Sequence, residues 1–353
     1  MSLSRSDSRF DLMRAAQLKS LRELVIETRP TPIAGPGQLL IRVEAAGLCG
    51  TDRHIFTGES PATLPLIPGH EICGIIQERG ADATRLAVGT RVTIDPNIAC
   101  RTCAACRRGD PHLCENLEAI GVTRDGGFAE YVTVPQAQAY LLPSDLPASF
   151  GVFCEPLACC LHGLDVARIR PGDSVAIFGG GVIGLLMVQL ARLAGATTVV
   201  LSTRQAARRT LAASLGATHT IDPAAHDPVH AIAGAGGIAL GGVDVVLECA
   251  GTADTFSQSI ATARRGGSVI LFGVVPKGQH VSVEPHELLF RELRLEGAYV
   301  NPFTHGRAAE LVASGSIALA PLITQTVPLD ELPRILGSAP GNGEVKTLVV
   351  PEP

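Results

Sequence analysis

The stretch GLCGTDRHIFTGESPATLPLIPGHEICG, residues 47–74, brings a thiol, two imidazoles and several carboxylates into one short span. Cys49, His70 and Glu71 are side chains of the kinds that bind zinc. A catalytic zinc takes about three protein ligands and keeps its fourth position open for water or substrate. Glu71 could equally orient the site without touching the metal. Glu155, in FCEPLACC, is a fourth candidate that would bind directly or through water, although a carboxylate before proline could also cap a helix.

A second cluster lies in CRTCAACRRGDPHLC, where four cysteines are separated by two, two and seven residues: Cys100, Cys103, Cys106 and Cys114. Four thiolates fill the tetrahedral shell of zinc and leave no position for a substrate, which is typical of a structural site. An iron–sulfur cluster could also use four cysteines. The turn-rich lobe around residues 97–118 favours zinc, which would replace core packing that this lobe lacks. We therefore predict two zinc ions in each chain, one catalytic and one structural.

A glycine-rich turn lies further along, in IFGGGVIG, between a predicted strand and a predicted helix. Its glycines are Gly179, Gly181 and Gly184, with Val182 and Ile183 between the last two. In this setting the first glycine allows a tight turn, and the second lets the backbone approach a pyrophosphate. The third lets the helix pack against the strand while its N-terminus faces the phosphates. The motif predicts a dinucleotide site.

The next strand indicates which dinucleotide binds. An NAD site usually carries Asp or Glu about 20 residues after the glycines, to bind the ribose hydroxyls. Here that place falls on Ser202 or Thr203, in VVLSTRQAARR. Arg204 and Arg208 follow, and guanidinium groups suit a phosphate, whereas Arg209 is interpreted as part of a solvated helix face. We predict NADP as the preferred cofactor, with NAD possible.

Composition limits the class of protein. With 353 residues, about two domains are expected. A net charge of −5 provides no basic stripe for nucleic acid and no patch for a membrane surface, so the expected partner is a small molecule. The N-terminal MSLSRSDSRFDLMRAAQ has no apolar core of a signal peptide. Ten cysteines in clusters then favour metal binding in a reducing compartment, and we expect a cytoplasmic protein.

The elements that must position these residues follow from the pattern along the chain. Residues 21–46 alternate apolar and polar side chains and are typical of strands, and the chain up to about 153 has the Gly, Pro and turn content of an irregular β domain. Short apolar runs then alternate with helical segments, which indicates a parallel sheet covered on both faces. The predicted strands are 174–180, 197–202, 243–251 and 268–274, and the predicted helices are 151–169, 182–196, 204–217 and 255–267.

With these motifs the chain resembles the zinc-containing medium-chain dehydrogenases/reductases, and within them it is most similar to the polyol branch of sorbitol and threonine dehydrogenases. The resemblance rests on CGTDRHIFTG, IPGHEICG, the four-cysteine run, GGFAEYVTVP, EPLACCLHG and IFGGGVIG, in that order. It implies an α/β protein in which a doubly wound Rossmann domain, 157–297, is inserted in a GroES-like catalytic domain, 1–156 and 298–353. It also implies that Cys49, His70 and Glu71 bind the catalytic zinc, with Glu155 as ligand or as partner of its water.

The resemblance further implies hydride transfer between an alcohol or polyol and a nicotinamide, with an active site in the cleft. Thr51 would pass the proton from the substrate and His54 would hand it to water, because the pKa of histidine lies near 6.5. His54 could also be an exposed loop histidine. Asp52 is expected to hold hydrogen bonds around His70. The chain departs from the NAD-using members at Thr203, which is usually acidic there.

Less specific expectations complete the picture. Carboxyl ends of parallel strands line a nucleotide crevice, so three short segments are expected to meet the nicotinamide half: Cys249, Ala250 and Gly251; Phe272, Gly273 and Val274; Ala298, Tyr299 and Val300. A homodimer or homotetramer is expected through HVSVEPHELLFRELRLEG, residues 280–297. Two rival interpretations remain at this stage: a zinc-free quinone or enoyl reductase of the same fold, and a non-catalytic binding protein.

Overall fold

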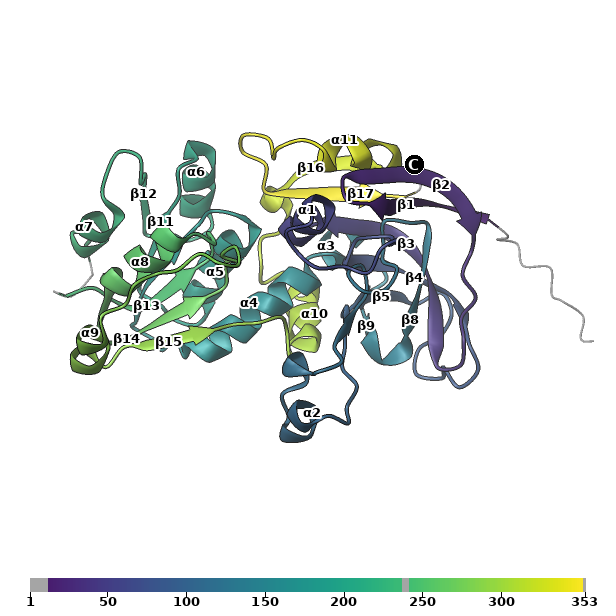
Figure 1. Cartoon of the computed structure of the whole chain (residues 1–353), viewed down its shortest axis with the longest axis horizontal. Coiled ribbons are helices and arrows are strands. Elements are labelled where there is room, and N and C mark those ends of the chain that lie inside the picture. Colours follow the sequence, from purple (N-terminus) through teal and green to yellow (C-terminus); the bar gives the residue numbers. More distant parts are fainter. Residues whose placement is uncertain (1–11, 237–240, 352–353) are drawn as a thin grey trace, which may run out of the picture. The chain divides into compact units, whose positions relative to one another are not determined.

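The computed structural model describes residues 12–236 and 241–351 (Figure 1). The chain forms two compact units, and each unit is made of segments that are separated in the sequence. The first unit takes the described residues up to Glu155, then Gln325–Pro340, then Thr347 onward. The second takes Pro156–Thr324 and Gly341–Lys346.

The first unit is built around an antiparallel sheet whose central strand is β3 (Gln38–Leu48). The order across the seven-stranded sheet is β16, β17, β3, β4, β5, β9, and β8 pairs with the other half of β3. Their bounds are β4 (Glu71–Arg79), β5 (Arg91–Ile94), β8 (Tyr131–Pro135), β9 (Ala139–Leu141), β16 (Ile323–Pro328) and β17 (Lys346–Val350). A hairpin of β1 (Leu12–Ser20) and β2 (Glu23–Pro30) lies beside it, and both contribute to one hydrophobic core.

The register of β3 and β4 brings the chemistry of residues 47–74 to one place. Gly47 is opposite Glu71 in this antiparallel pair. The chain leaves β3 at Leu48 and turns at Cys49 into helix α1 (Gly50–Thr57), while it enters β4 directly after His70. Cys49, directly after β3, and His70 and Glu71, at the start of β4, therefore lie at the same end of the β3–β4 pair.

Short helices and turns join the strands of the first unit. They are α1, α3 (Ala148–Gly151) and α11 (Leu332–Leu336), together with the turns η2 (Gln136–Gln138) and η4 (Leu329–Glu331). Arg53 ties α1 to the chain after β16, because its guanidinium donates to the carbonyl oxygens of Ile335, at 2.9 Å, and Ser338, at 2.7 Å. Two segments more than 280 residues apart are thereby held together.

The four-cysteine lobe has almost no core of its own. It is closed by a two-residue ladder of β6 (Asn97–Ile98) and β7 (Glu118–Ala119), and it holds α2 (Ala104–Arg108) and η1 (Pro111–Leu113). Between residues 97 and 119 the buried residues are Ala105 and Cys114. Such a segment buries too little apolar surface to offset its ordering entropy, so its shape must depend on the cysteines.

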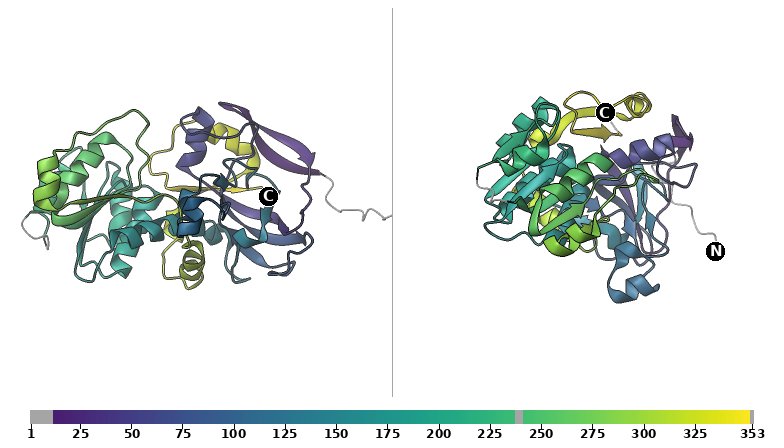
Figure 2. Two further views of the ribbon diagram at one scale, coloured as in Figure 1. Left: turned by 60° about the horizontal axis from the view of Figure 1, so that its bottom comes forward. Right: turned by 60° about the vertical axis from the view of Figure 1, so that its left-hand side comes forward.

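The second unit contains a six-stranded parallel sheet in the order β12, β11, β10, β13, β14, β15. This is the order 3-2-1-4-5-6 of a doubly wound dinucleotide-binding sheet, with helices on both faces (Figures 1 and 2). The predicted fold class is confirmed. The strands are β10 (Ser174–Phe178), β11 (Thr198–Ser202), β12 (His219–Ile221), β13 (Val243–Glu248), β14 (Ala263–Leu271) and β15 (Arg294–Gly297). The helices are α4 (Cys154–Ala167), α5 (Val182–Leu193), α6 (Ala206–Ser214), α7 (Pro228–Ala233), α8 (Ala253–Thr262) and α9 (Pro285–Arg291).

The segment after β15 also packs on the second unit. The hydroxyl of Thr304, just before α10 (His305–Ala313), donates to the carbonyl of Ala158 at 2.7 Å. The backbone amide of Ala318 donates to the Gln189 side chain at 2.7 Å, before the turn η3 (Ala320–Leu322). The compact first unit accordingly resumes at Gln325, whereas the sequence analysis placed the return at residue 298.

Within residues 12–236 and 241–351, one helical stretch, Ala148–Ala167, is long and apolar enough to cross a membrane by length and composition. Its apolar window is 67% buried inside the protein. The hydropathy of this stretch is that of a core helix, because the side chains that make it apolar already pack against the rest of the chain.

Candidate metal and dinucleotide sites

The ligand atoms of Cys49, His70 and Glu71 lie within 4.8 Å of one another, which is close enough to share one ion. Glu71 is fully buried, and His70 is 6% exposed. A buried carboxylate and a buried imidazole beside a thiol are costly without a partner. The set of one sulfur, one nitrogen and one oxygen donor fits zinc with an open fourth position.

Asp52 supports this trio from α1. Its carboxylate accepts hydrogen bonds from the backbone amides of Cys49, at 2.8 Å, and Gly69, at 3.2 Å, and lies 3.5 Å from His70 Nδ1. Burial alone would lower the pKa of His70, but the Asp52 carboxylate and the Cys49 thiol raise it well above its ordinary value. These two groups thus favour positive charge beside the ring, and a bound zinc ion would take the place of the proton.

Space for the Glu71 carboxylate comes from the residue opposite it in the sheet. A Cβ atom on Gly47 would lie 1.9 Å from Glu71 Oε2. Any side chain at residue 47 would therefore displace the carboxylate, and glycine there leaves the room that this orientation needs.

Glu155 is buried at 7% exposure and lies in the first turn of helix α4. Glu155 does not belong to the group of described residues whose ligand atoms lie within 4.8 Å of one another, which is Cys49, His70 and Glu71. Its predicted role as a ligand or as the partner of a zinc-bound water stays a prediction.

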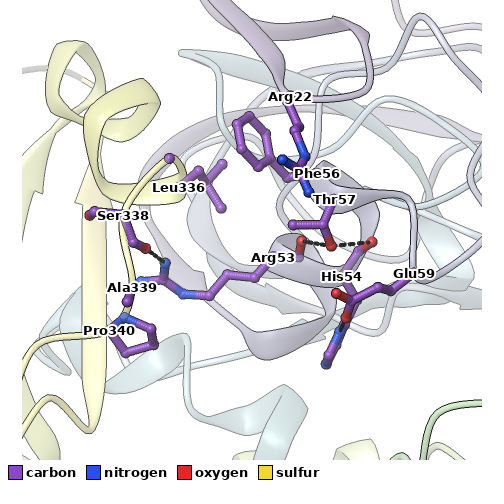
Figure 3. A pocket seen from close by; sticks show the side chains of 11 residues that line it. Arg22, Arg53, His54, Phe56, Thr57, Glu59, Leu336, Ser338, Ala339 and Pro340 are labelled. Carbon is purple, nitrogen blue, oxygen red and sulfur yellow. Dashed lines mark hydrogen bonds and ion pairs between the residues drawn. The ribbon is translucent and has the colours of Figure 1, made fainter.

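The two residues predicted to carry a proton lie on α1. The Cys49 sulfur is 3.7 Å from the Thr51 hydroxyl oxygen. His54 lies in the last turn, with its Nδ1 2.6 Å from Glu59 Oε2. Both His54 and Glu59 line a cavity between α1 and residues 336–340 (Figure 3). The pairing with Glu59 was not anticipated from the sequence.

The second metal cluster assembles as its spacing predicts, with the four sulfurs of Cys100, Cys103, Cys106 and Cys114 within 4.8 Å of one another. Hydrogen bonds from Thr102 lower the pKa of Cys100 to about 5. Backbone amides of Cys106 and Glu115 lower the pKa of Cys103, whereas burial raises that of Cys106 to about 12. Backbone N–H groups aimed at sulfur prepare thiolates, the form of cysteine that binds zinc.

The dinucleotide motif has the geometry that its glycines require. Gly179 has φ of 104°, and a Cβ there would lie 2.8 Å from the backbone of Cys249 and Ala250. A Cβ on Gly184 would lie 1.9 Å from the carbonyl of Gly179. Gly181 is the N-cap of α5, makes no side-chain cap, and faces open space. The first amides of α5, including those of Val182 and Ile183, are thus available to a phosphate group.

The ends of β11 and its loop lie against this turn. Ser202 is 5% exposed and Thr203 8% exposed, and a Cβ on Gly180 would come within 2.9 Å of the Thr203 side chain. Arg204 is exposed. At the end of β11, residues 202–204 provide two hydroxyls and a cation, and none of the three is a carboxylate.

The next two arginines differ from each other in their contacts. Arg208 donates to the backbone carbonyl of Glu344, and desolvation by burial lowers its pKa. Arg209 donates to the carbonyls of Thr203 and Arg204 and forms an ion pair with Asp222 at 2.8 Å. Arg209 therefore holds the loop after β11 in place. The sequence analysis had expected it on a solvated helix face.

The remaining predicted cofactor segments gather at the carboxyl edge of the sheet. Gly251, with φ of 73°, packs against the backbone of Val274, and Gly273 approaches Gly251 so closely that a Cβ would lie 2.1 Å from its amide nitrogen. Cys249 and Ala250 belong to the same loop, and the ring of Phe272 packs on Gly163 of α4. Phe272 thus anchors the loop that carries Gly273 and Val274.

The third segment follows β15 beside β14. The backbone amide of Ala298 donates a hydrogen bond to the carbonyl oxygen of Leu271 at 2.9 Å. Tyr299 is 56% exposed, and Val300 has φ of 49°.

The buried sulfur–imidazole–carboxylate trio and the doubly wound sheet with its open glycine turn define the class of a zinc-binding, nicotinamide-dependent dehydrogenase. Comparison with known families agrees. The chain matches the family model of the alcohol dehydrogenase GroES-like domain over residues 35–144 and that of the zinc-binding dehydrogenases over residues 182–314.

Individual relatives cover nearly the whole chain. D-arabinitol dehydrogenase 1 of Uromyces fabae is 32% identical over 340 residues, 96% of this chain and 97% of that protein. Sorbitol dehydrogenase of Bacillus subtilis is 30% identical over 324 residues, 90% of this chain and 91% of that protein. A crystal structure described as a zinc-binding dehydrogenase from Sinorhizobium meliloti 1021 bound to NADP is 54% identical, with a TM-score of 0.95 over 96% of this chain and 99% of that one. The chain belongs to the zinc-binding alcohol dehydrogenase family, and the predicted family and enzyme class are confirmed.

Proposed function

We propose that this chain interconverts an alcohol or polyol and its ketone, with NADP as the preferred cofactor. One observation carries the proposal. The ligand atoms of Cys49, His70 and Glu71 lie within 4.8 Å of one another, where the end of β3 pairs with the beginning of β4. The substrate class rests on similarity to the arabinitol and sorbitol dehydrogenases. Zinc, when bound by this trio, supplies Lewis-acid polarisation of a hydroxyl or carbonyl oxygen.

The chain's own residues then perform the remaining tasks. Asp52 holds the Cys49 amide, the Gly69 amide and the His70 ring in one arrangement, which keeps the donor set in place. The Thr51 hydroxyl, close to the Cys49 sulfur, takes the proton of a substrate hydroxyl and passes it toward His54. Glu155 completes the site through water. The open N-terminus of α5 binds the pyrophosphate.

Cofactor preference follows from the end of β11. Thr203 stands where NAD sites carry a carboxylate, and a hydroxyl donates to a 2′-phosphate that a carboxylate would repel. Arg204, exposed next to it, and Arg208 one turn along α6 add positive charge. The NADP-bound relative with 54% identity supports this choice. NAD is expected to serve as the poorer cofactor.

A second zinc is proposed for the four-cysteine lobe, where it has a structural role. Four sulfurs within 4.8 Å of one another support metal binding there over a single disulfide, and the lowered pKa of the Cys100 and Cys103 thiols favours the thiolate form that zinc binds. All ten cysteines are free thiols, which fits the expected cytoplasmic location.

Self-association is proposed through the edge of the second unit's sheet. β15 is the last strand in that sheet, and α9 before it exposes Leu289 at 70% and Phe290 at 60%. An unpaired edge strand beside exposed apolar side chains favours pairing with a second copy. Light scattering on the eluted protein should give the mass of two or four chains.

The function is tested by assaying a panel of polyols, secondary alcohols and ketones with NADP(H) and NAD(H), following absorbance of the reduced cofactor. We expect kcat/KM to be higher with the phosphorylated cofactor. Cys49→Ala should fold normally and lose turnover. A Cys49→Ala protein with normal turnover would support the zinc-free reductase interpretation, and turnover on no member of the panel would support the non-catalytic one.

A further inference from the structure

His54 and Glu59 are paired by the way α1 ends. Gly58 ends the helix with φ of 83°, and the backbone amides of Glu59 and Ser60 both donate to the His54 carbonyl, at 2.8 and 3.1 Å. This left-handed cap turns the chain back, so the Glu59 carboxylate comes to 2.6 Å from His54 Nδ1. The backbone of the cap therefore brings the two residues close together, and the contact forms between side chains that are 39% and 62% exposed.

An ionised carboxylate can only accept a hydrogen bond, so Nδ1 of His54 must carry the hydrogen. The other ring nitrogen, Nε2, is then the one with a free electron pair in the neutral ring. The pKa of Glu59 is lowered, chiefly by the hydrogen bond from His54, which keeps the carboxylate ionised at neutral pH.

The pair opens onto the cavity of Figure 3, which has a volume of about 370 Å³. The share of one water in the liquid is about 30 Å³, so the cavity has room for a group of waters. Two other charged groups line it, Arg22 from the β1–β2 turn and Arg53 on α1, and residues 336–340 contribute no ionisable side chain. Glu59 is the carboxylate among the lining residues.

We propose that Glu59 is a positioning residue for proton transfer: it fixes His54 as the Nδ1–H tautomer, so that Nε2 accepts the proton released by the substrate. The O–H bond of the donor hydroxyl breaks as the Nε2–H bond forms. That bond then breaks in turn, and the proton passes to water in the cavity. This inference rests on the role of His54 in the proposed function and adds the residue that orients it.

The test combines a structural and a kinetic measurement on the whole protein. The ¹⁵N chemical shifts of the His54 ring, assigned by comparison with His54→Asn, report which nitrogen carries the hydrogen. We expect the Nδ1–H form in the wild-type protein and its loss in Glu59→Ala. In Glu59→Gln and Glu59→Ala, kcat for alcohol oxidation at high pH should fall about 3- to 30-fold, a fraction of what general acid–base catalysis contributes.

KM for the cofactor should stay within about twofold in both Glu59 variants, since the fold and the dinucleotide motif are untouched. The matched control is Asp227→Asn, which removes the carboxylate from another exposed carboxylate–histidine pair, Asp227 with His230. It should leave both measurements at wild-type values.

Two results overturn the inference. One is a His54 tautomer that does not change in Glu59→Ala, and the other is a changed tautomer with an unaltered kcat. The His54→Asn variant shows whether the role of Glu59 alone is wrong or whether the proposed function is wrong as well. If His54→Asn is slowed at least tenfold while the Glu59 variants match the Asp227→Asn control, only the role of Glu59 is wrong. If His54→Asn turns over normally, the relay itself is wrong.

Discussion

Gly47 is the residue whose replacement should most selectively damage the catalytic metal site. Its ideal Cβ would lie 1.9 Å from Glu71 Oε2, 3.0 Å from Glu71 Cδ and 3.1 Å from Glu71 Cβ. Ordinary contact between such atoms is roughly 3.5 Å, so the carboxylate oxygen must move by roughly 1.5 Å in Gly47→Ala. Metal–ligand distances tolerate shifts of only about 0.2 Å. The displaced Glu71 can no longer keep its place beside Cys49 and His70.

The fold itself should survive this change. Gly47 lies in β3 and is not among the residues with positive φ, and alanine is favoured over glycine in a strand by roughly 0.5–1 kcal/mol. The closest atom is the far end of a flexible side chain. The loss therefore falls on metal binding, where disturbing a residue that supports the site costs about 10- to 100-fold in affinity. This corresponds to about 1.4–2.7 kcal/mol.

The assay is competition for zinc with a chelator of known affinity, run on the wild-type protein, Gly47→Ala and Gly50→Ala. Gly50 is three residues away, and a Cβ there would meet nothing within 4 Å. Gly47→Ala should release one zinc more readily and keep the one in the four-cysteine lobe, whereas Gly50→Ala should release neither. Wild-type zinc affinity at both sites in Gly47→Ala would refute the proposed ligand geometry.

Three further predictions follow from other parts of the chain. Thr203→Glu places a carboxylate beside the proposed 2′-phosphate and should lower kcat/KM for NADP about 100-fold, with little loss for NAD; equal losses with both cofactors would contradict the assignment. Cys106→Ala should remove the structural zinc and make residues 97–119 the first site of proteolysis, because this lobe buries only Ala105 and Cys114; an equally resistant lobe would contradict it. Burial lowers the pKa of His305 to about 3 from 6.5. The unfolded chain therefore takes up the proton first as pH falls, and the free energy of unfolding should drop by about 2 kcal/mol between pH 8 and pH 5. Urea unfolding at pH 8 and pH 5 should show a loss of stability that is smaller by about 2 kcal/mol in His305→Gln than in the wild-type protein; equal losses in the two proteins would contradict it.

Much of the site could be predicted from the sequence because its chemistry is concentrated in short motifs. The spacing of the four cysteines indicated a shared metal site, and their sulfurs lie within 4.8 Å of one another. The glycines at 179, 181 and 184 follow a mechanical rule, and their φ and contacts match the roles assigned to them. Parallel strands β10, β11, β13 and β14 were predicted because buried strands form short apolar runs bounded by turns.

Other features depend on contacts that no local pattern records. The space that Gly47 provides for Glu71 follows from the register of β3 against β4, which sequence spacing does not give. The approach of residues 341–346 to Arg208 and Gln205 joins segments more than 130 residues apart. The short strand β12 has too few residues for a periodic signal, and residues 298–324 lose the strand–helix alternation while still packing on the second unit. The Glu59–His54 pair had a local signal, a histidine followed by Gly-Glu at the helix end, that was not used.

The most direct measurement is the number of zinc ions per chain by mass spectrometry of the metal, on the same freshly purified, unchelated preparation whose ketone reduction by NADPH is assayed. The account predicts about two zinc ions per chain in the active wild-type protein, and about one in an inactive Cys49→Ala. A wild-type preparation that reduces its ketone at full rate while carrying zinc only in the four-cysteine lobe would contradict it.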